Sequence, residues 1–248
     1  MSGAEQQGFM VQIHGHIPPA LDPYRRTPAW VPAYIDRYWR LVERHAAVLS
    51  GHFFGHWHSA EVRVAPLVAP LVAPLVAPHA WGDLAVRAPR SPALRSRRAP
   101  ALQVISAISP IYHSNPVFYS ATFDPSTFRI QPGCFMQYVL NLSTAGEPGR
   151  FFASPRAVPS GGLTNGDYSA AIASWLSGSP QGEAAFDRFY AQRKNYRPAS
   201  GLRAACSATT DVFDECLTST GGCRVAFACF NSHGLTSEDF AACVAANT

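Results

Sequence analysis

The stretch from Pro32 to Leu49 narrows the choice of fold more than any other part of the chain. Its apolar residues recur at the spacing of one helical face, and Gly51 follows as a natural stop. Segments with the pattern of short strands lie on both sides, at 10–13 and 61–64. A strand, an amphipathic helix and another strand in this order predict an α/β fold. The apolar residues of the predicted helix are Ile35, Tyr38, Trp39, Val42, Ala46 and Leu49.

Histidines beside glycine mark the ends of these strands. His16 lies just beyond the first strand, where two prolines prevent its extension. His56 and His58 lie in a glycine turn that we expect to join residues 53–54 to 61–64 as a strand pair. Residues two apart on an extended segment point to one face, so both imidazoles are expected to reach one metal site, or one ion each of a pair. A lone histidine is more often a structural polar residue, and the paired spacing is what favours ligands here.

A low-complexity insertion is predicted over residues 65–99. The tetrapeptide Ala-Pro-Leu-Val repeats three times and starts a fourth, and an arginine-rich stretch follows it. The period is too short for a solenoid repeat, and the prolines disfavour both strand and helix. Beyond the insertion, strands are expected at 102–108 and 117–123, with another at 128–142.

The last hundred residues have a helical pattern and most of the cysteines. Helices are expected at 168–176, 183–193 and 237–246, and Thr236 with Asp239 forms a capping-box pattern before the last. A disulfide-rich appendage in an oxidising compartment is the favoured interpretation, while a zinc site competes without any C-x-x-C pair to support it. The disulfide candidates are Cys206, Cys216, Cys223, Cys229 and Cys243.

Two further features bear on the compartment. Asn141-Leu142-Ser143 is a glycosylation sequon, which agrees with an exported protein. The first residues contain Glu5, Gln6 and Gln7 where a secretory signal has its apolar core, so no signal peptide is visible. This conflict predicts that the chain is incomplete at its N-terminus.

Composition excludes several classes of protein. With 47% hydrophobic residues in 248, the chain is long enough to bury a sizeable core. Its formal charge of +4 comes from five arginines of the insertion, which alternate with Ala, Pro and Ser rather than with aromatics, so a nucleic-acid partner is not expected. No run of eighteen apolar residues occurs, so no transmembrane segment is expected.

The ordered set of motifs resembles the acid sphingomyelinase branch of the calcineurin-like metallophosphoesterases. Gly15-His16-Ile17-Pro18-Pro19 is followed by a helix and by Phe53-Phe54-Gly55-His56-Trp57-His58. Ser106-Ala107-Ile108-Ser109-Pro110, Asn115-Pro116-Val117-Phe118 and Tyr138-x-x-Asn141-Leu142 then match later segments of that branch. The resemblance covers residues 11–142 without the insertion, and it is weaker in the cysteine-rich end.

The resemblance implies the C-terminal half of a four-layer αββα sandwich. Residues 1–64 and 100–145 would form this half-domain, and 150–248 a helical, cysteine-rich subdomain. In that family two zinc ions share a hydroxide that attacks a phosphodiester. Carried over, His16 and His56 would bind one ion and His58 the other. The resemblance also implies a phospholipid or other phosphodiester substrate, transient membrane contact, and a secreted or lysosomal location.

The departures from the family pattern define the alternatives. An upstream Asp-x-His, the Gly-Asp of the bridging aspartate and a Gly-Asn-His are absent, so no catalytic acid is assigned. His52 stands where relatives often have glutamine, and Ser59-Ala60 replaces an acidic position. We expect an incomplete phosphodiesterase chain, inactive alone. The alternatives are a catalytically inactive remnant that serves as a binding module, and an unrelated α/β protein with structural histidines.

Overall fold

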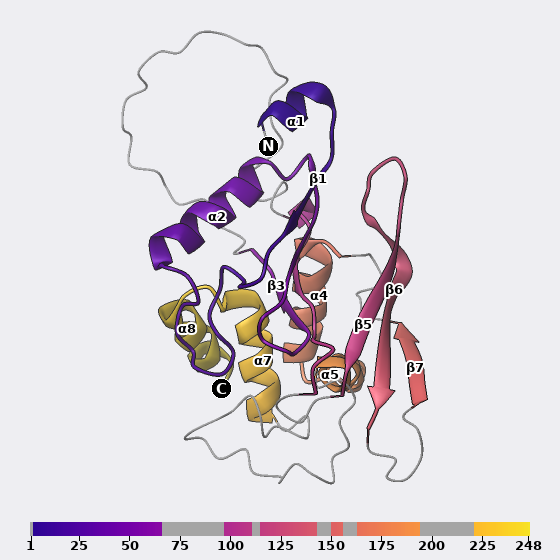
Figure 1. The fold of residues 1–248 in the computed structure, drawn as a ribbon. Helices are drawn as coiled ribbons and strands as arrows, with labels where there is room; N and C mark the ends of the chain where they lie inside the picture. Colours follow the sequence, from indigo (N-terminus) through magenta and orange to yellow (C-terminus); the bar gives the residue numbers. More distant parts are fainter. Residues whose placement is uncertain (1, 66–96, 111–114, 143–149, 156–162, 194–220) are drawn as a thin grey trace, which may run out of the picture.

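The chain forms a mixed α/β structure, as Figure 1 shows for the computed structural model. The structure describes residues 2–65, 97–110, 115–142, 150–155, 163–193 and 221–248. Within these ranges, two sheets lie beside a group of C-terminal helices, which confirms the predicted fold class. The four-layer αββα arrangement and the division into domains stay predictions.

The described elements are α1 (Ser2–Gln7), β1 (Val11–His14), α2 (Pro32–Arg44), β2 (Leu49–Phe54), β3 (Glu61–Arg63), β4 (Leu102–Val104), β5 (Val117–Phe123), β6 (Ile130–Asn141), β7 (Arg150–Pro155), α4 (Asn165–Leu176), α5 (Pro180–Arg193), α7 (Gly221–His233) and α8 (Ser237–Asn247).

Helix α2 covers one face of a four-stranded sheet, as its apolar stripe predicts. Ile35, Trp39 and Val42 are its buried residues, and the Trp39 ring contacts the His52 ring of β2 edge-on. The helix ends at Arg44, earlier than predicted, and Leu49 is the first residue of β2. The end of α2 and the start of β2 both bury their apolar residues, so helical spacing alone did not reveal where the helix ends. Gly51 therefore lies inside a strand and does not stop the helix.

The order of strands in this sheet corrects the predicted strand pair. The order is β1-β2-β4-β3, with β1, β2 and β4 parallel and β3 antiparallel to β4. Strand β4 lies between β2 and β3, so residues 53–54 do not pair with 61–63. The sequence offered no signal for this, because β4 follows the insertion and reaches its place only through long-range pairing. Strand β4 is also shorter than the predicted 102–108.

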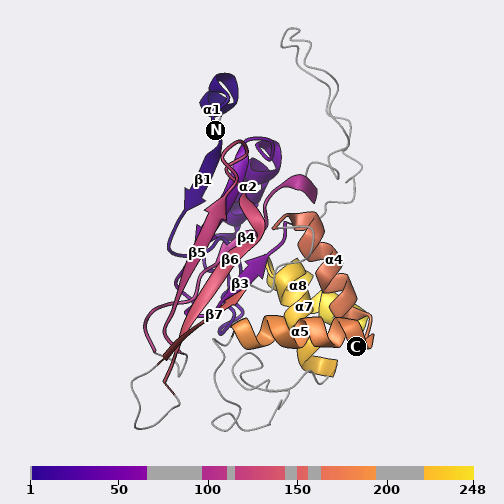
Figure 2. The same ribbon diagram turned by 90° about the vertical axis from the view of Figure 1, so that its right-hand side faces the viewer.

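A second, antiparallel sheet has the order β5-β6-β7 and lies alongside the first (Figure 2). Strands β5 and β6 match the predicted segments closely, whereas β7 was not predicted. The Gln12 side chain donates a hydrogen bond to the Phe128 carbonyl at 3.3 Å and joins the two sheets. The sequon residue Asn141 ends β6, where it is partly exposed.

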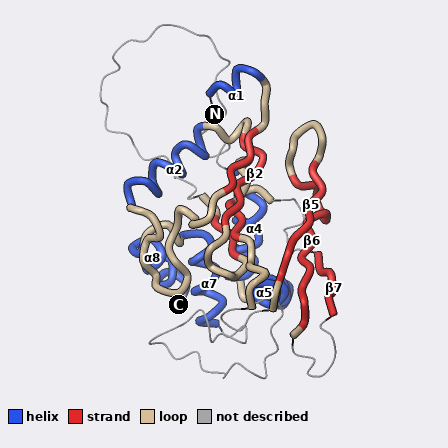
Figure 3. Tube along the Cα trace, in the orientation of Figure 1, coloured by secondary structure: helices blue, strands red, loops and turns tan. Residues whose placement is uncertain are grey.

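The C-terminal helices share a hydrophobic core with β3. The predicted helices are confirmed as α4, α5 and α8, and the Thr236 hydroxyl accepts the Asp239 amide at the start of α8. Helix α7 was not predicted, although it supplies the fully buried Phe227 and Phe230. Figure 2 shows these helices on one side of the strands, and Figure 3 marks them in blue. The buried residues that join helices and strand include Val62, Tyr168, Phe186, Phe189 and Phe227.

One predicted disulfide candidate pair is bonded. Cys229 of α7 and Cys243 of α8 form a disulfide. Cys206, Cys216 and nearly all of the predicted insertion, residues 66–96, lie outside the described residues, as does the side chain of Cys223. None of the helices in the described ranges is both long and apolar enough to span a bilayer.

Candidate functional site

The parallel pairing of β1 and β2 brings His16 and His56 together. Each histidine follows the carboxyl end of its strand by two residues, at the same edge of the sheet. Backbone hydrogen bonds fix the two ends, from the Gly15 amide to the Phe53 carbonyl and from the Gly55 amide to the His16 carbonyl. A Cβ atom at Gly15 would overlap the Phe54 ring, so glycine allows this close approach. Such edges commonly carry ligand sites in α/β sheets.

The two imidazoles face each other across a short distance. Nδ1 of His56 lies 3.2 Å from Nε2 of His16, and the ring centroids are 5.0 Å apart. Both side chains are exposed. Two nitrogens bound to a tetrahedral zinc at about 2.0–2.1 Å are separated by about 3.3 Å. The spacing of this pair therefore fits two ligands of one zinc ion.

The segment that carries His56 and His58 is a turn, as predicted, but its backbone is strained rather than extended. His56 has φ of 74° and His58 has φ of 58°, in the left-handed region that non-glycine residues rarely adopt. Each such residue costs about 1–3 kcal/mol, and such strain is concentrated at functional sites. Burial of His58 lowers its pKa, and the nearby imidazoles of His56 and His16 lower it further. All three predicted ligands therefore lie in one region.

Trp57 anchors this turn between the two strained histidines. Its side chain is buried, and its carbonyl accepts a hydrogen bond of 2.8 Å from the Tyr24 hydroxyl. The Arg63 guanidinium lies 5.1 Å from the centre of the indole and 3.7 Å from that of Phe230 in α7. The turn is thus packed from both the N-terminal loop and the C-terminal helices.

A fully buried cluster of charges lies directly behind the turn. Glu61 of β3 is 2.7 Å from Arg193 of α5 and 3.5 Å from Arg63, and it accepts a hydrogen bond of 2.9 Å from Ser59. All three charged side chains are inaccessible to solvent. Burial by itself would raise the pKa of Glu61, but the two guanidinium groups and the hydrogen bonds lower it overall. Burial lowers the pKa of Arg63 to about 10, so it stays charged at neutral pH.

Sequence reasoning did not find this cluster. It identified the acidic position that Ser59 and Ala60 lack, but not that Glu61 supplies a carboxylate two residues later. The signal available was the pattern of alternate charges in Glu61-Val-Arg63 within an otherwise apolar strand. Arg193 had no local signal, because its contact with Glu61 spans more than a hundred residues of the chain.

His52 has a structural role where β2 packs against α2. Its ring is fully buried, its Nε2 donates to the Pro100 carbonyl at 2.9 Å, and its Nδ1 accepts from the Tyr38 hydroxyl at 2.8 Å. Burial lowers the pKa of His52 from 6.5 to about 4, although the bond to Pro100 opposes this. The ring is therefore neutral and does not join the exposed histidines.

The described residues do not complete a metal site by themselves. Within those ranges, no group of three or more His, Cys, Asp or Glu side chains has an arrangement that would hold an ion. The histidine pair fits zinc in donor type and spacing, and it leaves at least one ligand of a catalytic site to be supplied.

Comparison with known proteins finds relatives named as phosphodiesterases of the sphingomyelinase type. The chain is 26% identical over 127 residues to sphingomyelinase phosphodiesterase D of Dictyostelium discoideum. It is 32% and 34% identical over 65 residues to the acid sphingomyelinase-like phosphodiesterase 3b of Mus musculus and of Homo sapiens. No model of a protein family matches the chain.

These similarities cover only part of each protein. The alignment with the Dictyostelium protein spans 51% of this chain and 24% of that protein, and those with the mammalian proteins span 26% of this chain and 14% of theirs. The matches support a relationship to sphingomyelinase-type phosphodiesterases at modest identity.

Proposed function

We propose that this chain supplies the histidine side of a metal-dependent phosphodiesterase site. The observation that carries the proposal is the convergence of His16 and His56 at one edge of a parallel sheet, with His58 in the same turn. The relatives are named as phosphodiesterases of the sphingomyelinase type, which supports this reaction class over other uses of histidine. The chain is then a hydrolase component with a phosphodiester substrate.

The three histidines would divide between two metal ions. His16 and His56 would bind one zinc, and His58 would bind the second. When bound, such a pair supplies a nucleophilic hydroxide at neutral pH and offsets charge on the phosphate oxygens. The chain's own contribution is to hold the imidazoles in place through the strained turn, with Trp57 packed beneath it.

The substrate and compartment follow from the relatives and are part of the proposal. A phospholipid such as sphingomyelin, or another phosphodiester, would be cleaved in a secreted or lysosomal setting with transient contact to a membrane surface. The disulfide of Cys229 and Cys243 agrees with an oxidising compartment.

Metal binding and hydrolysis test the proposal separately. We expect zinc titrated into the purified protein to release heat on binding, with that binding weakened at least about tenfold in His56→Ala, since one ligand is lost. The chain alone is expected to hydrolyse bis(4-nitrophenyl) phosphate only slowly with added zinc, because it lacks part of the site, and this residual hydrolysis is expected to be lost in the same variant. His233→Ala, which removes an exposed histidine of α7, serves as the matched control. Zinc binding that is identical in all three proteins would contradict the assignment.

A catalytically inactive binding module is the second candidate. It is favoured by the absence, among the described residues, of a third group that completes a metal site. In that case wild-type protein would bind zinc weakly through His16 and His56 and would show no hydrolysis of the diester above a buffer control. Zinc-dependent hydrolysis that His56→Ala abolishes would eliminate this candidate.

A further inference from the structure

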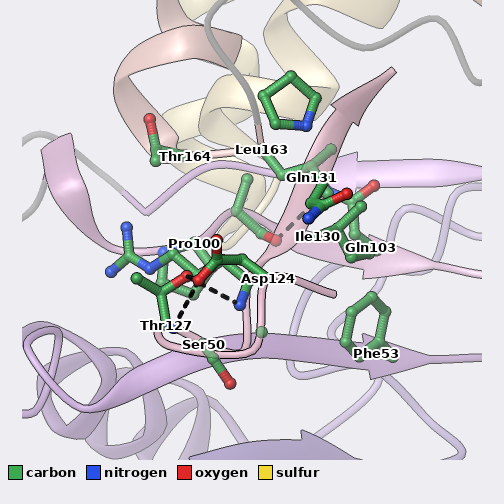
Figure 4. Close-up of a pocket in the computed structure, with 14 residues that line it drawn as sticks. Ser50, Phe53, Pro100, Gln103, Asp124, Thr127, Ile130, Gln131, Leu163 and Thr164 are labelled. Carbon is green, nitrogen blue, oxygen red and sulfur yellow. Dashed lines mark hydrogen bonds between the residues drawn. The ribbon is translucent and has the colours of Figure 1, made fainter. Parts of the chain in front are cut away.

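A pocket separate from the histidine edge lies between the two sheets. It has a volume of about 290 Å³, near the lower limit for small-molecule sites. Its walls come from β2 and β4, from the turn between β5 and β6, and from the residues before α4, as Figure 4 shows. None of the three candidate ligand histidines lines it.

The pocket has an aromatic side and a polar side. Phe53 lies on one side, with Asp124 and Thr127 on the other (Figure 4). The Phe53 ring folds back over Gly51, where an added Cβ would come within 2.7 Å of the ring. Glycine therefore allows the ring to lie in the pocket wall with Ile130 and Leu163, which together offer an apolar surface. The ring also stacks on His14, with a centroid distance of 5.4 Å.

A half-buried arginine, Arg129, places a positive charge in the pocket wall. Arg129 lines the pocket, and throughout the described ranges no carboxylate lies within ion-pair distance of its guanidinium. Burial lowers the pKa of Arg129, and the like charge of the nearby Arg98 lowers it further. A guanidinium group without a carboxylate partner can form paired hydrogen bonds with the oxygens of a phosphate.

Among the described residues of the pocket wall, Asp124 is the one carboxylate, and it is engaged in its own turn. Oδ1 of Asp124 accepts hydrogen bonds from the amides and hydroxyls of Ser126 and Thr127. These bonds, the Ser126 hydroxyl first, lower the pKa of Asp124 to about 2, so the group stays ionised. An anion in the pocket would lie on the Arg129 side, and repulsion from the Asp124 carboxylate would weaken its binding.

We propose that this pocket binds a small organic phosphate, with the phosphate beside Arg129 and an apolar or aromatic body against Phe53. The phosphate would pair with the Arg129 guanidinium, and its organic group would fill the apolar wall. The site is independent of the phosphodiesterase proposal, because it shares no residue with the histidine edge.

Binding of phenyl phosphate to the full chain, measured by calorimetry in the presence of a chelator, tests this site. We expect saturable binding at millimolar concentrations or below, weakened about tenfold or more in Arg129→Met, since one charge-assisted contact is lost. Asp124→Asn should strengthen binding several-fold, because a like charge leaves the wall while the turn keeps its acceptor. Inorganic phosphate should bind more weakly than phenyl phosphate, and neutral benzyl alcohol should not bind.

Two control variants separate this site from other sources of binding. Arg37→Met removes an exposed arginine of α2 and should leave the affinity unchanged. His56→Ala should also leave it unchanged. The proposal is overturned if wild-type protein shows no saturable binding, if Arg129→Met behaves as Arg37→Met does, or if His56→Ala abolishes binding while Arg129→Met does not.

Discussion

Acid should weaken this fold through His52, and His52→Gln should remove that effect. In the folded protein the ring is fully buried between Pro100 and Tyr38, and its pKa is lowered from 6.5 to about 4. Below pH 6.5 the unfolded chain takes up a proton on this residue while the folded chain does not. The stability that the neutral ring provides is therefore present above pH 6.5 and is lost as the pH falls toward 4.

The size of the effect follows from the two pKa values. The full shift is equivalent to about 3 kcal/mol, at about 1.4 kcal/mol per unit. Between about pH 7 and about pH 4.5, linkage of this one group removes about 2 kcal/mol from the free energy of unfolding. Because the ring is inaccessible to solvent, no reduction for screening at the surface is needed. For a chain of this size, that is about 4–8 °C of melting temperature.

Thermal unfolding of wild type and His52→Gln across this pH range tests the reasoning. Glutamine keeps a donor for Pro100 and an acceptor for Tyr38 but does not titrate. The loss of ring packing lowers the stability of the variant at every pH. The difference in the free energy of unfolding between the two proteins should therefore change by about 2 kcal/mol in favour of the variant from neutral to acid pH. His233→Gln, in an exposed position, is the matched control. Parallel curves for wild type and His52→Gln would refute the argument.

Three other changes test the packing of the fold. Glu61→Gln removes the carboxylate that pairs with the buried Arg63 and Arg193, so denaturant titration should show a loss of about 3–5 kcal/mol in the free energy of unfolding. The control Glu238→Gln, on the surface of α8, should lower it by less than about 1 kcal/mol. Replacing Cys229 and Cys243 together by serine should cost about 3 kcal/mol, and equal melting temperatures in oxidised and reduced wild-type protein would contradict this. Thr164→Ala removes the capping box of α4 and should cost about 1 kcal/mol, with Thr164→Ser nearly neutral in the same assay.

Local patterns in the sequence predicted the elements but not how they pair. Strands β5 and β6 and helix α2 have clear periodicity, and the structure has them close to the predicted residues. The pairing of β3 with β4 depends on contacts across the insertion, and periodicity contains no information about partners. Helix α7 was missed because its first residues are glycines and its cysteines were interpreted as disulfide candidates rather than as part of a helical pattern.

The candidate site was predictable to a similar extent. Parallel strands that each end in a glycine and a histidine meet at one edge, so the approach of His16 to His56 follows from local pattern and sheet topology. The left-handed backbone of His56 and His58 does not follow from local pattern, because non-glycine residues rarely adopt it, and the structure buries Trp57 between them. Long-range packing determines how the ligands are held.

The contact between Glu61 and Arg193 means that the histidine turn and helix α5 should open together. Amide hydrogens of the Trp57 segment can exchange with solvent only when the turn separates from its packing, and Arg193 is bonded to that segment through both its side chain and its backbone carbonyl, which accepts the Ala60 amide. Exchange rates in residues 57–62 and in the last turn of α5 should therefore rise together as denaturant is added. Helix α5, which belongs to the predicted helical subdomain, would then determine how long the turn stays closed.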